Sequence, residues 1–129
     1  MKQENGYRCP FCSPEHVILG NDLGRVIADP YPVSPGHLLV IPYRHCVDFF
    51  GLTAEERVAM WELLSEARAY LQEKYQPDGF NIGVNLGSVA GQSIEHVHIH
   101  LMPRYAGDMR DPLGGVRGIL PARRKYPRE

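Results

Sequence analysis

One segment of the chain alternates histidine with aliphatic residues over six positions. It covers residues 96–101 and reads His-Val-His-Ile-His-Leu. Because successive side chains of a β-strand point to opposite faces, this pattern predicts a strand over 94–102 with three histidines on one face and three apolar side chains in the core. Half of the six histidines of the chain lie here. Clustered imidazoles are typical of catalytic or metal sites, so a functional site is favoured over a merely polar strand face.

Three imidazoles on one strand admit a catalytic zinc site, with water as the fourth ligand. The spacing weighs against it, because alternate strand residues stand about 6.6 Å apart and reach one metal only with favourable rotamers and strand curvature. A row of imidazoles along a phosphate chain suits this spacing better.

The rest of the chain predicts an α+β fold, an antiparallel sheet with one long helix. Residues 25–29 and 37–42 are short apolar runs on either side of a Pro- and Gly-rich turn, which predicts a hairpin. Residues 80–84 and the histidine strand, which Pro103 should end, predict a second hairpin around the loop 85–92.

A helix is expected to begin after Thr53, whose hydroxyl can cap it while Glu56 reaches back to the Thr53 N–H. It should end before Pro77. Apolar residues at steps of three and four predict the stripe that packs on the sheet: Met60, Trp61, Leu64, Ala67 and Leu71.

Length and composition indicate one globular domain over residues 1–129, with an extended or partly mobile tail from about residue 106. No apolar run is long enough to span a membrane, and the N-terminus shows no export signal, so a cytoplasmic protein is expected. Lys plus Arg (14) nearly equals Asp plus Glu (15), so nucleic acid is not an expected partner. A membrane is not expected either, because no apolar run could span one.

Residues 91–100, Gly-Gln-Ser-Ile-Glu-His-Val-His-Ile-His, resemble the signature of the histidine-triad (HIT) family. Residues 35–42, Pro-Gly-His-Leu-Leu-Val-Ile-Pro, resemble its upstream strand, and the resemblance covers about residues 9–105. It implies a HIT-like fold of about five antiparallel strands and one helix, a homodimer, and hydrolysis of a nucleotide at its α-phosphate. The segment 102–108 is more similar to the dinucleoside polyphosphate hydrolases than to the nucleoside phosphoramidases.

The resemblance implies a nucleotide substrate, with adenosine favoured. Dinucleoside polyphosphates come first and nucleoside phosphoramidates second, while phosphorolysis and a slow nucleotide-binding regulatory module stay open. Transfer of a nucleotide to a sugar phosphate is disfavoured, because those relatives have glutamine in the place of His100.

The resemblance also implies the roles of the catalytic histidines. His98 matches the nucleophile, which forms a covalent nucleotidyl-histidine that water hydrolyses. Its other ring nitrogen should donate to an acceptor that fixes the tautomer, and a backbone carbonyl is one candidate. His100 and His37 match histidines around the α-phosphate, where donors offset charge on the non-bridging oxygens. A packed structural histidine is the alternative for each.

Four polar residues match nucleotide-contacting positions of the family. Gln92, Ser93 and Asn85 match phosphate-side positions, although turn chemistry alone accounts for these residue types. Asp29 matches the ribose-binding acid, since a carboxylate accepts hydrogen bonds from both ribose hydroxyls. The dinucleoside polyphosphate hydrolases tend to have asparagine and glutamine at the Asp29 and Asn85 positions, so this pair is similar to the phosphoramidase branch instead.

Cys9 and Cys12 form a CxxC pair, which in a reducing compartment binds metal or does redox chemistry more often than it forms a disulfide. Some bacterial relatives combine such a pair with two histidines, which here would be His45 and His96. The four side chains suit a tetrahedral structural zinc site. Reduced free thiols are the alternative, and Cys46 is left over.

Overall fold

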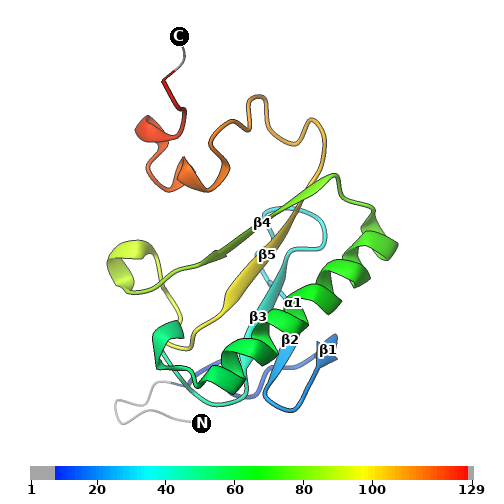
Figure 1. The fold of residues 1–129 in the computed structure, drawn as a ribbon, viewed down its shortest axis with the longest axis vertical. Helices are drawn as coiled ribbons and strands as arrows, with labels where there is room; N and C mark the ends of the chain where they lie inside the picture. Colours follow the sequence, from blue (N-terminus) through cyan, green and yellow to red (C-terminus); the bar gives the residue numbers. More distant parts are fainter. Residues whose placement is uncertain (1–7, 128–129) are drawn as a thin grey trace.

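The computed structural model describes residues 8–127, and it shows one five-stranded antiparallel sheet and one long helix (Figure 1). The strand order is β1-β2-β3-β5-β4. The strands are β1 (Leu19–Gly20), β2 (Gly24–Ala28), β3 (Leu38–Pro42), β4 (Gly79–Val84) and β5 (Ile99–Arg104). The predicted α+β architecture and both predicted hairpins, β2–β3 and β4–β5, are confirmed.

The helix α1 (Ala54–Tyr75) begins and ends where the sequence predicts. Thr53 Oγ1 accepts the Glu56 N–H at 3.0 Å, and Glu56 Oε1 accepts the Thr53 N–H at 2.8 Å, so the capping box is complete. Gln76 adopts the left-handed conformation that stops the helix before Pro77.

One member of the predicted helix stripe is wrong. Trp61 is 66% exposed, whereas Leu63 is fully buried in its place. Met60, Leu64, Ala67 and Leu71 are buried as expected. The buried face of α1 therefore centres on Leu63 and Leu64, and Trp61 lies outside this face.

The two faces of the sheet have different coverings. Helix α1 lies across one face (Figure 1), and its core cluster includes Val26, Val40, Ile99 and Leu101. Because strand side chains alternate, His98 and His100 belong to the opposite face. A smaller cluster packs on that second face and draws in the N-terminal segment: Cys9, Phe11, Ile27, Leu39 and Ile41.

Strand β5 is shifted along the chain from its predicted position. It begins at Ile99 rather than at residue 94, because the Val97 N–H donates to the Cys46 carbonyl at 2.7 Å and not to a sheet partner. It also continues through Pro103 to Arg104. Since β3 pairs with β5 only as far as Leu101, Pro103 occupies a position where its missing N–H costs no bond to β3.

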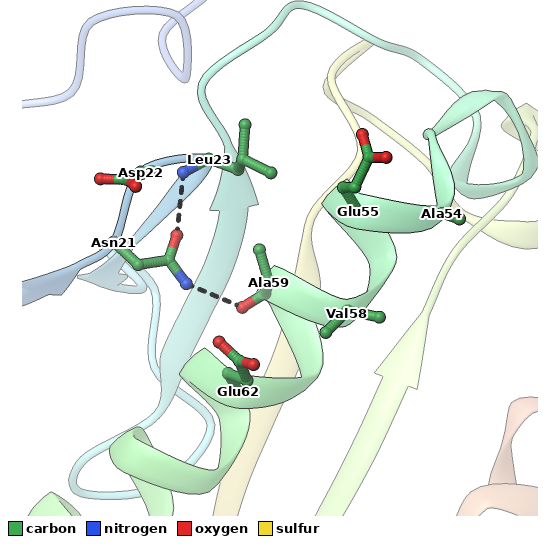
Figure 2. Close-up of a pocket in the computed structure, with 8 residues that line it drawn as sticks. All are labelled: Asn21, Asp22, Leu23, Ala54, Glu55, Val58, Ala59 and Glu62. Atoms are coloured by element: carbon green, nitrogen blue, oxygen red, sulfur yellow. Dashed lines mark hydrogen bonds between the residues drawn. The ribbon is translucent and has the colours of Figure 1, made fainter.

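The turn between β1 and β2 is attached to α1 through Asn21 (Figure 2). Its side-chain amide donates to the Ala59 carbonyl at 3.0 Å and its Oδ1 accepts the Leu23 N–H at 3.0 Å. A Cβ at Gly24 would collide with Met60 Cε and lie 2.8 Å from the Ile41 carbonyl oxygen, so only glycine allows this close approach. None of the predicted site residues lines the hollow beside this turn.

The tail is locally folded as far as residue 127. It contains two short 3-10 helices, η3 (Gly115–Ile119) and η4 (Pro121–Arg123). Arg124, directly after η4, donates to the carbonyls of Asp111 and Leu113 at 2.6 and 2.8 Å and so fixes the end of η4 to the segment before η3. The described part of the tail is thus a string of turns rather than an extended segment. Over residues 8–127, the structure has no helix with the length and apolar character that a membrane crossing demands.

Candidate active site and metal centre

His98 lies immediately before β5 and is buried. Its Nδ1 is 2.8 Å from the His96 carbonyl oxygen, which can only accept a hydrogen bond, so Nδ1 carries a proton. A neutral His98 therefore presents an unprotonated Nε2. The ring of Phe11 packs edge-on against His98, with ring centroids 5.0 Å apart. Position and tautomer together give His98 the form that a nucleophilic imidazole needs.

His37 and His100 form a directed pair of hydrogen bonds. The Val33 N–H donates to His37 Nδ1 at 3.1 Å, so the proton of neutral His37 is on Nε2. That Nε2–H donates to His100 Nδ1 at 2.9 Å, which leaves the proton of His100 on its own Nε2. The chain of bonds starts at a backbone amide and makes His100 Nε2 a donor. His98 and His100 have ring centroids 5.1 Å apart, so a ring with an acceptor nitrogen lies next to a ring with a donor nitrogen.

Burial keeps this pair neutral. It lowers the pKa of His100 to about 4, and the neighbouring His98 and His37 lower it further, against the opposing effect of Asp29. Burial also lowers the pKa of His37, again against Asp29. Near neutral pH both rings are uncharged, which the bonds from the Val33 N–H to His37 and from His37 to His100 together require.

Asp29 lies against the histidine pair, a contact that the sequence did not indicate. Its Oδ2 is 3.3 Å from His37 Nε2 and 3.7 Å from His100 Nδ1, while its Oδ1 accepts the Tyr31 N–H at 2.8 Å. Each carboxylate oxygen has two acceptor sites, so these contacts leave capacity for an added hydroxyl donor.

Gln92 shapes the loop before the histidines rather than lining an open surface. Its Oε1 accepts the Gly87 N–H at 2.9 Å, and its Nε2 donates to the carbonyls of Val47 and Ile94 at 2.8 and 3.3 Å. Ser93 is exposed next to it. Asn85 directly follows β4, and because Val84 pairs with Ile99, Asn85 lies level with His98 across the sheet.

The four predicted metal ligands come together in a second cluster. Their ligand atoms all lie within 4.8 Å of one another. Cys9 Sγ is 3.3 Å and Cys12 Sγ is 3.6 Å from His96 Nδ1, and Cys12 Sγ is 3.2 Å from His45 Nδ1. In a tetrahedral zinc site with the usual bond lengths, sulfur and nitrogen ligands are about 3.5 Å apart, so these separations fit the metal.

The orientation of His96 also fits a metal ligand. Its Nε2–H donates to the Pro42 carbonyl at 2.9 Å, so Nδ1 presents a lone pair to the two sulfurs. Burial lowers the pKa of His96 to about 4, against the opposing hydrogen bond to Pro42, so the ring is neutral. Burial and the neighbouring Cys9 raise the pKa of the Cys12 thiol, which metal binding would have to overcome.

Two residues that the sequence did not single out support the cluster. Arg25, on β2, donates through one guanidinium nitrogen to the carbonyls of Phe11 and Cys12, at 2.8 and 2.6 Å. Phe11 packs between the two sites, since its ring contacts both His96 and His98. An arginine in an otherwise apolar strand was the available signal for the first. Nothing in the sequence distinguished Phe11.

Comparison with known proteins agrees with this geometry. The family model of the HIT domain matches residues 11–107, which is most of the chain. The chain belongs to the HIT family. Within it, the AP-4-A phosphorylase of Mycobacterium tuberculosis (strain ATCC 25618 / H37Rv) is 38% identical over 93 residues, which cover 71% of this chain and 48% of that protein. This HIT chain thus spans about half the length of that relative.

Other HIT relatives are similarly close. A bis(5'-adenosyl)-triphosphatase of Dictyostelium discoideum is 33% identical over 95 residues, which cover 74% of this chain and 64% of that protein. Among solved structures, a zinc-bound histidine-triad protein from Mycobacterium smegmatis is 33% identical with a TM-score of 0.71, covering 81% of this chain and 83% of that one. A HIT protein from Bacillus subtilis has a TM-score of 0.73 at 28% identity, covering 79% and 77%.

Proposed function

We propose that this HIT protein hydrolyses dinucleoside polyphosphates, with adenosine as the favoured nucleoside, at the α-phosphate. The observation that carries the proposal is the tautomer of His98, whose Nδ1–H is bound to the His96 carbonyl so that Nε2 is left with a lone pair. Relatives named as a bis(5'-adenosyl)-triphosphatase and as an AP-4-A phosphorylase support this substrate class.

In the first step, His98 Nε2 forms a bond to the α-phosphorus while the bond from that phosphorus to the bridging oxygen breaks. The rest of the polyphosphate leaves with the electron pair, and His98 becomes a nucleotidyl-imidazolium that keeps its Nδ1–H on the His96 carbonyl. In the second step, water attacks the phosphorus, the P–N bond breaks, and its electron pair returns to Nε2. The proton lost by the water passes to solvent.

His100 and His37 are the proposed electrostatic partners. His100 Nε2–H would donate to a non-bridging oxygen of the α-phosphate, where negative charge builds in the transition state. His37 acts through His100 by fixing its tautomer, as the 2.9 Å bond between them requires. Asp29 is the proposed ribose acceptor, with Asn85 and Ser93 on the phosphate side, and Gln92 positions the loop that carries Ser93.

Zinc is the proposed ligand of Cys9, Cys12, His45 and His96. The ligand separations fit it, and the Mycobacterium smegmatis relative is a zinc-bound protein. With four protein donors the metal would have no open position, so it would stabilise the segment before β5 instead of activating water.

A homodimer is proposed from the free edge of the sheet. Strand β4 is terminal in the strand order, and an apolar groove of about 470 Å³ runs between β4 and α1. Trp61 and Ile82 line it, and both are exposed. An exposed apolar edge of this kind is a self-pairing surface, and a second copy would cover it across a two-fold axis.

Two other reactions compete at the same site. Attack of inorganic phosphate on the nucleotidyl-histidine would give a nucleoside diphosphate, and the AP-4-A phosphorylase relative favours this outcome. Nucleoside phosphoramidate hydrolysis is favoured by the presence of Asp29 and Asn85 in place of asparagine and glutamine. The non-enzymatic alternative is a regulatory module that binds nucleotides without rapid turnover.

A substrate panel tests the proposal. Diadenosine polyphosphates and adenosine phosphoramidates are incubated with the full chain, with and without inorganic phosphate, and both turnover and affinity are measured. If the nucleotide released from nucleotidyl-His98 is AMP, the reaction is hydrolysis. If ADP forms only when inorganic phosphate is present, the reaction is phosphorolysis. Fastest turnover on a phosphoramidate, or tight binding with no turnover of any compound, contradicts the proposed function.

A further inference from the structure

Arg25 is an unusual residue for the interior of a small sheet. It is only 8% exposed, although guanidinium groups are rarely buried unless they are paired. Across the residues that the structure describes, no acidic side chain is placed in an ion pair with it. Its bonds go instead to the carbonyls of Phe11 and Cys12 and its guanidinium stacks over the ring of Tyr43 at 4.6 Å.

The Arg25 guanidinium also has spare donor capacity. Its Nε is the only buried side-chain nitrogen or oxygen, within residues 8–127, that has no hydrogen-bond partner. A buried donor without a partner is unfavourable and calls for a physical reason. The guanidinium binds the backbone of the turn that carries Cys9 and Cys12, and these cysteines become thiolates when a metal binds.

We propose that Arg25 is a positioning residue of the Cys9–Cys12–His45–His96 cluster. Arg25 holds the CxxC turn in the conformation that binds metal, and its fixed positive charge stabilises the metal-bound thiolates. The inference rests on the proposed zinc site. The turn is held at the two consecutive carbonyls on either side of the Cys12 Cα, so the direction of the Cys12 side chain depends on these hydrogen bonds. A cation beside bound thiolates lowers their electron density and favours the charged form.

The hydrogen bonds of Arg25 also act on the proposed nucleophile His98, through Phe11. The carbonyl that Arg25 holds belongs to the residue whose ring packs on His98 at 5.0 Å and on His96 at 6.2 Å. Arg25 therefore positions one wall of the His98 site as well as the metal ligands.

The test compares Arg25→Met, Arg25→Lys and the control Arg68→Met in the full chain. Methionine keeps an apolar stem and removes the charge and the donors, while lysine keeps the charge on a point ammonium. Arg68 is exposed on α1, on the other face of the sheet, and stacks on Phe80 at 5.9 Å. Zinc affinity is measured by competition with a chromophoric chelator, and Co²⁺ is used as a spectroscopic probe of the thiolates.

The expected result is a loss of zinc affinity of about 10- to 100-fold in Arg25→Met, the range typical of residues that orient metal ligands. Arg25→Lys should lose less, but at least about threefold. The thiolate-to-cobalt charge-transfer band should move to longer wavelength in Arg25→Met and return toward its wild-type position in Arg25→Lys, because only the charge controls it. Arg68→Met should leave both measurements unchanged.

Wild-type zinc affinity and an unshifted cobalt band in Arg25→Met would overturn the proposal while leaving the zinc site standing. If Arg25→Met does not fold, Arg25→Lys decides, and wild-type affinity in that variant overturns the proposal in the same way. A wild-type chain that takes up neither zinc nor cobalt at this cluster would overturn both the zinc site and the role of Arg25.

Discussion

The Nδ1–H of His98 donates to the main-chain carbonyl of His96 at 2.8 Å, while the side chain of His96 faces Cys9 and Cys12. One residue thus contributes its backbone to the candidate nucleophile and its ring to the candidate metal cluster. The two candidate sites are therefore joined through one residue, His96.

His98→Ala should abolish turnover and preserve nucleotide binding. The substitution removes the attacking nitrogen but none of the other proposed contacts, so kcat should fall by at least about 10⁴, which is about 5 kcal/mol of barrier. Substrate affinity should stay within about threefold of wild type. Rapid quench at alkaline pH, where the P–N bond survives, followed by peptide mass analysis should find the nucleotide on the peptide that contains His98 in the wild type. A label on another residue, or near-normal turnover in the variant, would contradict the mechanism.

Stability should fall as the pH falls below the ordinary pKa of histidine. His100 titrates at 6.5 in the unfolded chain and at about 4 in the folded one, so between these values the unfolded chain binds a proton that the folded chain does not. The free energy of unfolding then rises with pH across this window, by up to about 1.4 kcal/mol per pH unit. Urea unfolding at several pH values, at constant zinc, measures the slope.

The matched variants for this slope are His100→Gln and His16→Gln. His16 is 94% exposed at its side chain, so its loss should leave the slope unchanged, whereas His100→Gln should make it shallower. Equal slopes in His100→Gln and the wild type would show that the buried pair is not what couples stability to pH.

Cys12→Ser should abolish zinc binding, and Cys46→Ser should not. Cys46 is next to His45 in sequence, but its Sγ donates to the Asp48 carbonyl at 3.2 Å, and it is not a member of the ligand cluster. Elemental analysis should give one zinc per chain for the wild type and Cys46→Ser. With free zinc 1,000-fold above its Kd, the metal adds about 4 kcal/mol of stability, so a chelator should lower Tm by about 10–20 °C. An identical Tm with and without chelator would remove the zinc site.

Ile82→Glu should convert the proposed dimer into a monomer. Ile82 lies in the edge strand β4 and lines the groove beside α1, so a carboxylate there would be buried without a partner in the dimer. Val17→Glu is the control, since Val17 is similarly exposed but precedes β1 at the other edge of the sheet. Sedimentation velocity at micromolar concentration distinguishes the two. A wild-type monomer with full activity would contradict the dimer.

Local signals in the sequence predicted the elements well. The Thr53–Glu56 capping box marks the start of α1, because its hydrogen bonds join residues three apart. The alternation over residues 96–101 correctly separates His98 and His100 from Ile99 and Leu101, because side-chain direction in an extended chain depends only on the pleat.

Long-range contacts set what the sequence could not predict. The start of β5 depends on the bond from the Val97 N–H to the Cys46 carbonyl, which forms only when the two segments meet. The exposure of Trp61 depends on where the sheet ends beneath the helix, and helical periodicity carries no information on that edge. The contact of Asp29 with His37 depends on the conformation of the turn between β2 and β3.

The acceptor for His98 is an oxygen of the polypeptide backbone, so no amino-acid replacement at position 96 deletes it. The candidate metal ligand at position 96 can therefore be replaced without removing the acceptor that fixes the tautomer of His98, as long as the segment keeps its backbone path.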